Sequence, residues 1–253
     1  MNKKVPIIII CILAILIIIV LFYSQTQNKA VEEAKYLILG EQTLWKYENN
    51  TWQSESPSSF DSSTKMLVYI NEGYQGIYKA EYVNSWNFLT NESKYLNYDD
   101  NILATTQNLV NNIERITNEE CLQSDVNFIN ELTSKSYSDL SNITCSKYSV
   151  DLNNDGIKDY LISANNFIEE QTNSYFNLLY TNINGTRTII KKNNIEPKNA
   201  LLNPTYHLYS VIKLNDQKTP NLIFKKAYFS NVHKPSFVMY QSNNQKYEVV
   251  VED

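Results

Sequence analysis

Hydrophobic and polar positions alternate over most of residues 36–98, which is the pattern of strands with one buried face. Asn49–Asn50 is a turn signal between two such runs, and residues 66–70 (Met-Leu-Val-Tyr-Ile) form the clearest strand. The pattern predicts a small β-rich unit over residues 36–98.

The hydrophobic period changes after Asp99–Asp100. Apolar residues then recur at helical spacing, with Asp100 as a candidate cap; they are Ile102, Leu103, Leu109, Val110, Ile113 and Ile116. A second helix is predicted to begin near Ser124–Asp125 and to carry Val126, Phe128, Ile129 and Leu132. We therefore expect residues 99–142 to form a two-helix segment that covers a sheet, with a partner-binding site as the alternative role.

The chain returns to a β pattern over residues 143–253 and contains a weak internal repeat there. Residues 150–162 align with residues 212–224, so the two copies lie 62 residues apart. Each copy reads as a loop, a strand, a connection and a hairpin. The expected fold is α+β and mostly β, and residues 143–253 are expected to form a partial propeller-like domain or stacked sheets.

Residues 5–23 are almost wholly apolar, which is long enough to span a bilayer as a helix. Lys3 and Lys4 precede this run and predict that the N-terminus stays in the cytoplasm. The apolar run is long for a cleaved signal peptide, and no small-x-small cleavage site follows it. The sequence therefore predicts an uncleaved transmembrane signal anchor over residues 1–23 and a polar linker over residues 24–35. The predicted location is a bacterial inner (cell) membrane, with the C-terminal part in the periplasm or outside the cell.

Residues 151–159 (Asp-Leu-Asn-Asn-Asp-Gly-Ile-Lys-Asp) are the strongest candidate site. Oxygen-bearing side chains fall at alternate positions around Gly156, which permits a sharp turn. Calcium takes six to eight oxygen ligands, and no soft ligand that would favour zinc or copper is present. The candidate ligands are the side chains of Asp151, Asn153, Asp155 and Asp159 and the backbone carbonyl of Ile157. The alternative is an Asx-rich turn without an ion.

The loop resembles the nine-residue calcium loops of FG-GAP and VCBS-type repeats, because a strand follows it directly and Ile162 occupies the position where an EF-hand needs glutamate. This resemblance implies a structural calcium ion. The second copy, residues 213–221, has lost its ligands: Lys213 replaces Asp151, Gln217 replaces Asp155 and Lys218 replaces Gly156. We expect calcium to bind the first copy only.

Cys121 and Cys145 are the only cysteines outside the apolar N-terminal run. Two cysteines in an oxidising compartment usually form a disulfide, and a pair fits a periplasm. The bridge would close a loop of about 25 residues and contribute about 3 kcal/mol in the loop-entropy model. The alternative is two free buried thiols.

The composition limits the possible functions. A net charge of −5 argues against binding to nucleic acid, because phosphate recognition needs a basic surface. Trp45, Trp52 and Trp86 could form a sugar-binding platform, although core packing or cross-strand pairing is the more common role of such residues.

We find no convincing catalytic motif in the sequence. The main hypothesis is therefore a non-enzymatic, membrane-anchored binding protein with a structural calcium site, whose partner is another envelope protein or a glycan. One alternative is a glycan hydrolase using carboxylates such as Glu119–Glu120 or Glu169–Glu170. The other is a structural subunit of a secretion or pilus assembly.

Overall fold

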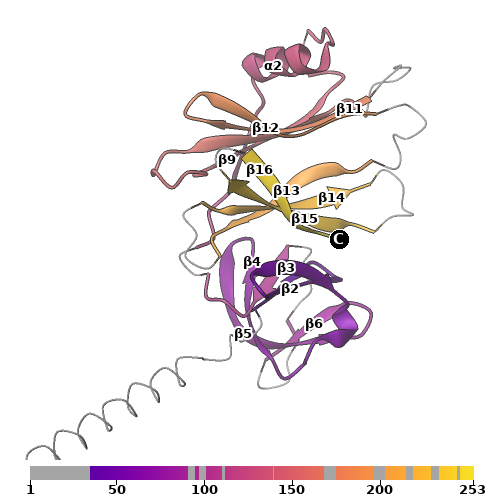
Figure 1. The fold of residues 1–253 in the computed structure, drawn as a ribbon, viewed down its shortest axis with the longest axis vertical. Helices are drawn as coiled ribbons and strands as arrows, with labels where there is room; N and C mark the ends of the chain where they lie inside the picture. Colours follow the sequence, from indigo (N-terminus) through magenta and orange to yellow (C-terminus); the bar gives the residue numbers. More distant parts are fainter. Residues whose placement is uncertain are drawn as a thin grey trace, which may run out of the picture. The chain divides into compact units, whose positions relative to one another are not determined.

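In the computed structural model, the chain between Lys35 and Asp253 forms three antiparallel β-sheets (Figure 1). The structure describes residues 35–90, 95–96, 101–109, 112–138, 140–167, 175–195, 203–214, 219–228, 234–243 and 246–253. We name the sheets A, B and C. Hydrophobic clusters join sheet A to sheet B, sheet B to sheet C, and sheet C to a helix.

Sheet A has seven strands in the order β3-β2-β1-β7-β4-β5-β6. The strands are β1 (Lys35–Leu39), β2 (Thr43–Glu48), β3 (Thr51–Glu55), β4 (Lys65–Ile70), β5 (Gly73–Tyr82), β6 (Trp86–Leu89) and β7 (Ile102–Thr105), and a 3-10 turn, Pro57–Ser59, follows β3. The predicted turn at Asn49–Asn50 joins β2 to β3, and both residues have positive φ. Ile38 and Ala104 belong to a cluster made only of sheet A and its connections, so the sheet curves around this cluster.

The predicted helix over residues 102–116 is wrong. Ile102–Thr105 is strand β7, which pairs with both β1 and β4 in the middle of sheet A. All four residues of β7 are buried. A short run that is buried on both faces has no alternation, and periodicity alone cannot separate such a strand from a buried helix. The α+β class with a two-helix segment is therefore corrected to a mostly β protein.

Sheet C has five strands in the order β12-β11-β10-β9-β8. The strands are β8 (Thr117–Glu119), β9 (Thr144–Val150), β10 (Asp159–Asn165), β11 (Tyr175–Ile183) and β12 (Thr186–Ile195). The helix α2 (Gln123–Thr133) is the only α-helix among the described residues, and it lies where the second helix was predicted. Ile129 of α2 packs on Ile162 and Tyr180 of sheet C. At the start of α2, the backbone N–H of Leu122 donates to the Asp125 carboxylate at 2.9 Å.

The predicted disulfide is confirmed. Cys121 and Cys145 are bonded, with their Cα atoms 6.3 Å apart. The bond joins the segment between β8 and α2 to strand β9. It therefore fixes the three-residue edge strand β8 beside β9 from its C-terminal side.

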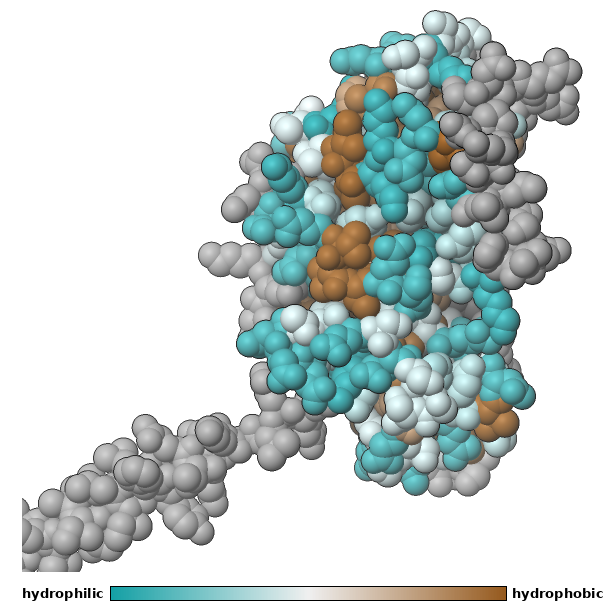
Figure 2. Space-filling view, turned by 45° about the vertical axis from the view of Figure 1, so that its right-hand side comes forward, coloured by the Kyte–Doolittle hydropathy of each residue, from teal (hydrophilic) through white to brown (hydrophobic). Residues whose placement is uncertain are grey.

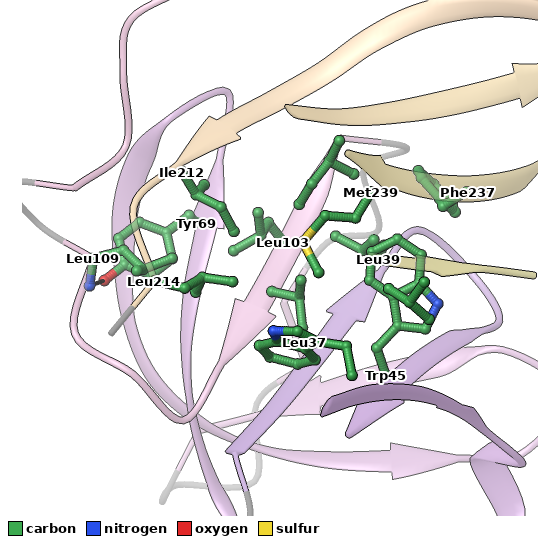
Figure 3. Packing of buried hydrophobic residues seen from close by; sticks show 13 residues of the cluster. Leu37, Leu39, Trp45, Tyr69, Leu103, Leu109, Ile212, Leu214, Phe237 and Met239 are labelled. Atoms are coloured by element: carbon green, nitrogen blue, oxygen red, sulfur yellow. Dashed lines mark hydrogen bonds between the residues drawn. The ribbon is translucent and has the colours of Figure 1, made fainter. Parts of the chain in front are cut away.

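Sheet B is a four-stranded meander of β13 (Thr205–Ile212), β14 (Asn221–Ala227), β15 (Ser236–Asn243) and β16 (Lys246–Glu252). Strands β9 to β12 follow the same meander, so the two copies of the weak repeat adopt one topology. Each face of sheet B contributes buried residues to a cluster shared with another sheet. Met239 and Phe237 pack on Leu39 of sheet A (Figure 3), whereas Phe224 and Val238 face sheet C.

The membrane predictions are not supported. No helix among the described residues is long and apolar enough to cross a membrane. Helix α2 has 11 residues, about half the length that a bilayer requires. The apolar run at residues 5–23 lies outside the described residues. The predicted single-pass signal anchor and the predicted cell-membrane location are therefore not supported by the structure.

Candidate functional site

The candidate calcium loop connects β9 to β10 and is organised around Asp151. One carboxylate oxygen of Asp151 accepts the backbone N–H groups of Asn154 at 2.6 Å and Asp155 at 3.3 Å. The other accepts the N–H of Gly156 at 2.9 Å. Gly156 has a φ of +82°, which turns the chain back toward Asp151. The Asp151 carboxylate thus holds the curvature of the loop by accepting backbone N–H groups of the residues that follow it.

The other two carboxylates of the loop differ in burial. Asp155 is exposed, and hydrogen bonds from the Ile157 N–H and from the side chains of Asn153 and Asn184 lower its pKa. Asp159 is 1 % exposed, and burial raises its pKa against two backbone N–H donors, Leu152 and Asn184. Asn184, in the β11–β12 turn, therefore contacts both carboxylates, and spacing within the loop gave no signal for it.

The oxygen donors of the loop suit calcium, but in the described conformation they do not converge on one point. Among the described residues, no group of three acidic, histidine or cysteine side chains is placed to hold an ion. No lysine bonds to the loop carboxylates in the contacts described: Lys158 donates to the Arg115 carbonyl at 3.1 Å, and Lys213 pairs with Glu114 at 3.1 Å. The Ile157 side chain is exposed.

The three tryptophans lie in the core. Trp45 and Trp52 belong to the cluster between sheets A and B, and Trp86 belongs to the cluster inside sheet A. Their relative exposures are 0 %, 7 % and 2 %, so they do not form an exposed platform. The Trp45 indole N–H donates to the Asp253 carboxylate at 2.7 Å. The aromatic positions thus serve packing, the common alternative for such residues.

A groove of about 580 Å³ opens where the three sheets meet, and we call it the three-sheet groove. Sheet A contributes the β4–β5 turn and Leu103, sheet B contributes residues 208–210 of β13, and sheet C contributes β8 and β9. Its polar lining comprises Tyr69, Asn71, Glu72, Asn101, Asn118, Glu119, Ser146, Lys147, Tyr148, Tyr209 and Ser210. Ile113 and Ile116 line it from the segment that crosses from sheet A to sheet C.

Several contacts position these walls. The Tyr69 hydroxyl accepts the N–H of Leu109 at 2.9 Å, and the Tyr209 hydroxyl donates to the Ile102 carbonyl. The Tyr209 ring packs edge-on against Phe237, with 4.9 Å between centroids. A shift in the β13–β14 register between Leu208 and Ser210 lies at the same place. Such irregularities redirect side chains, and this one falls among three consecutive groove residues.

Glu72 is held in an unusual backbone conformation at the groove. Asn71 and Glu72 form the β4–β5 turn with φ values of +47° and +62°. Hairpin turns with two positive φ values favour glycine at the second position, where a side chain is strained. Here a glutamate, Glu72, occupies it and is one of the residues that line the groove. Strain retained at a cavity is a reason to look for function there.

The ionisable groups make the groove acidic. Burial raises the pKa of Glu72, and the nearby Arg115 opposes this effect. Glu119 lies on the exposed edge strand β8. Lys147 is committed elsewhere, since its ammonium pairs with Asp125 at 3.2 Å and lies 4.3 Å from the Tyr160 ring centroid. A neutral polar ligand therefore fits the groove better than an anionic one.

Figure 2 shows one face of the molecule, on which apolar surface is confined to separate patches among hydrophilic residues. This face therefore offers no broad apolar surface for docking another protein. The polar groove is the better candidate for recognition.

The chain matches no protein-family model, no curated protein and no solved structure. Its function is therefore argued from the site alone. Sequence reasoning missed the groove because its residues come from segments between residue 69 and residue 210 that only the fold brings together. One local signal existed, since Asn71-Glu72-Gly73 places a glutamate in a hairpin turn where Asn-Gly is favoured.

Proposed function

We propose that this protein is a non-enzymatic carbohydrate-binding protein, with the three-sheet groove as the ligand site. The observation that carries the proposal is the lining of this groove by residues with amide, hydroxyl, carboxylate and phenol groups from all three sheets. Amides and hydroxyls can donate and accept, which suits a ligand with many hydroxyl groups. Tyrosine offers an apolar ring surface and a polar tip.

A glycan is preferred to a protein partner for a physical reason. Stable protein interfaces have an apolar core rimmed by polar residues, whereas this groove is predominantly polar. Its acidic character and the committed ammonium of Lys147 favour a neutral glycan.

Calcium at residues 151–159 is part of the proposal, in a structural role. Asp151, Asn153, Asp155, Asp159 and the Ile157 carbonyl would hold the ion, which would draw together carboxylates that otherwise repel one another. The loop adjoins the groove through the crossing segment, because Lys158 donates to Arg115 and Lys213 pairs with Glu114. Ile113 and Ile116 of that segment line the groove. Calcium would therefore stiffen one wall of the binding site.

The proposal is tested by probing an array of immobilised glycans with the fluorescently labelled protein in calcium. Binding of a restricted set of neutral glycans is expected, and Asn118→Ala in the groove should weaken it. Asn127→Ala is the matched control, because Asn127 is an exposed asparagine on α2 and does not line the groove. Binding to no glycan, or equal binding by both variants and the unaltered protein, would contradict the proposal.

Glycoside hydrolysis is a second candidate, because two carboxyl groups, Glu72 and Glu119, line one groove. Burial raises the pKa of Glu72, as a proton donor requires, and Glu119 lies on the exposed strand β8. Glu169–Glu170 lie outside the described residues. Release of reducing ends from a bound oligosaccharide, abolished by Glu72→Gln, would establish this activity in place of simple binding.

A further inference from the structure

A second, smaller cavity of about 230 Å³ adjoins the three-sheet groove. It is lined by Thr144, Ser146, Ser163, Asn165, Thr205, Tyr206 and His207. Ser146 of β9 lines both cavities, so they lie next to each other along the edges of β9 and β13. The two cavities share Ser146 and have mainly polar lining residues, and we call them together the furrow.

Sheet C carries a polar strip at this cavity, on the face that elsewhere packs against sheet B. Ser146 lies directly opposite Ser163, and Thr144 lies opposite Asn165. Further along the same two strands, Val150 and Leu161 are buried in the cluster between the sheets. Ser163 and Asn165 are each only 3 % exposed. Burying polar groups is costly unless they are satisfied, so a polar strip on a core-facing surface calls for an explanation.

His207 presents an acceptor at the far end of the furrow. The Thr205 hydroxyl donates its single hydrogen to the Ala227 carbonyl at 3.2 Å, so the Nε2 of His207, 3.1 Å away, is the donor to Thr205. The Nδ1 of the neutral ring then keeps its lone pair. Burial of the imidazole and the charge of Lys225 lower the pKa of His207, although the residue as a whole is exposed. The ring is neutral near pH 7 and adds no charge to the furrow.

We propose that the furrow binds a linear, neutral oligosaccharide of N-acetylated amino sugars, with consecutive sugars in the groove and in the Ser146–His207 cavity. The inference rests on the proposed carbohydrate-binding function and adds the ligand's length and class. Three asparagines, Asn71, Asn101 and Asn118, line the groove. A carboxamide pairs with an acetamido group through complementary donor and acceptor atoms. Lys147, the one basic residue among the described lining residues of the groove, pairs with Asp125 and is not free to bind an acidic sugar.

The test is isothermal titration of the full chain with N-acetylglucosamine oligomers of one to six residues, in calcium. Affinity is expected to rise at least tenfold from the monomer to the longer oligomers and then to level off. His207→Ala should lower the affinity for the longer oligomers at least fivefold and leave the affinity for the shortest oligomer that binds unchanged. Asn118→Ala should weaken the binding of oligomers of every length, and Asn127→Ala should leave the binding of all of them unchanged. Melting curves of each variant establish that the fold is intact.

The two proposals fail in different ways. Affinity that does not depend on length, or a His207→Ala effect equal for all lengths, overturns the furrow while leaving a single-site carbohydrate-binding protein. Absence of binding by this series, with binding of other glycans on the array, overturns the ligand class proposed here. Absence of binding in both experiments overturns the carbohydrate-binding function itself.

Discussion

Lys213 donates a hydrogen bond through its ammonium group to the side-chain oxygen of Asn154. Lys213 stands at the first position of the degenerate repeat copy, where the first copy has Asp151. Where the first copy has a candidate ligand, the second copy thus has a cation, and this cation contacts the loop of the first copy. The same ammonium pairs with Glu114 at 3.1 Å, and the Lys213 N–H donates to the Asn112 carbonyl at 2.7 Å. The second repeat therefore supports the first loop through Lys213.

Removing calcium is expected to lower the melting temperature of the protein. If free calcium is 100-fold above Kd, binding stabilises by about 2.7 kcal/mol. At 2–4 °C per kcal/mol this predicts a shift of roughly 5–10 °C between calcium and EDTA, measured by differential scanning fluorimetry. Asp155→Ala should abolish the shift. Asp61→Ala is the control, because Asp61 is an exposed turn aspartate that accepts the Ser63 N–H at 2.9 Å. Equal melting temperatures in calcium and EDTA would leave the loop as an Asx turn.

Asp125→Ala should destabilise the protein strongly. The change leaves the Lys147 ammonium, which is buried between α2 and sheet C, without its carboxylate. Breaking a buried ion pair from one side costs about 3–5 kcal/mol. The double variant Asp125→Ala/Lys147→Met should recover part of this loss in urea unfolding. The more exposed pair Lys46–Glu48 gives the comparison, since Glu48→Ala should destabilise the protein much less than Asp125→Ala does. A double variant no more stable than Asp125→Ala would contradict this account.

Reduction of the disulfide should weaken both the fold and ligand binding. Loss of the crosslink between Cys121 and Cys145 costs about 3 kcal/mol in the loop-entropy model. Binding should also weaken, because the crosslink follows directly after β8, whose Asn118 and Glu119 line the groove. Melting temperature and oligosaccharide affinity are measured with and without dithiothreitol. The Cys121→Ser/Cys145→Ser variant should have the melting temperature and affinity of the reduced protein, and dithiothreitol should not change either value. An unchanged affinity of this variant would show that β8 stays in position without the disulfide.

Glu72→Gly should stabilise the protein and weaken binding. Glycine adopts a φ of +62° without the left-handed penalty of about 1–2 kcal/mol that other residues bear, so a net gain of about 1 kcal/mol is expected. The groove would lose a carboxylate at the same time. Asn50→Gly is the matched control, because Asn50 occupies the corresponding position of the β2–β3 turn with a φ of +64° and lies outside the groove. It should leave affinity unchanged. A Glu72→Gly variant that binds as well as the original would show that the glutamate has no role in recognition.

The sequence predicted local features better than assembled ones. The Asn49–Asn50 turn, helix α2 and the Cys121–Cys145 bond each depend on a short signal, and each is present. Strand β7 was missed because Ile102–Thr105 is buried on both faces between β1 and β4, which removes the alternation that identifies a strand. The groove was missed because Glu72, Ser146 and Ser210 become neighbours only through sheet packing. Asn184 was missed for the same reason, since it reaches Asp155 from another turn.

Each face of sheet B packs against a neighbouring sheet, and this arrangement affects how the protein unfolds. Opening its contact with sheet A would expose Met239 and Phe237, and opening its contact with sheet C would expose Phe224 and Val238. Unfolding of sheet A or sheet C alone would therefore expose hydrophobic residues of sheet B to water. Calorimetry should record a single heat-absorption peak for the unfolding of residues 35–253. Limited proteolysis should cut surface loops of the folded protein or degrade the unfolded chain completely, and it should not release a stable fragment that contains only one or two of the sheets.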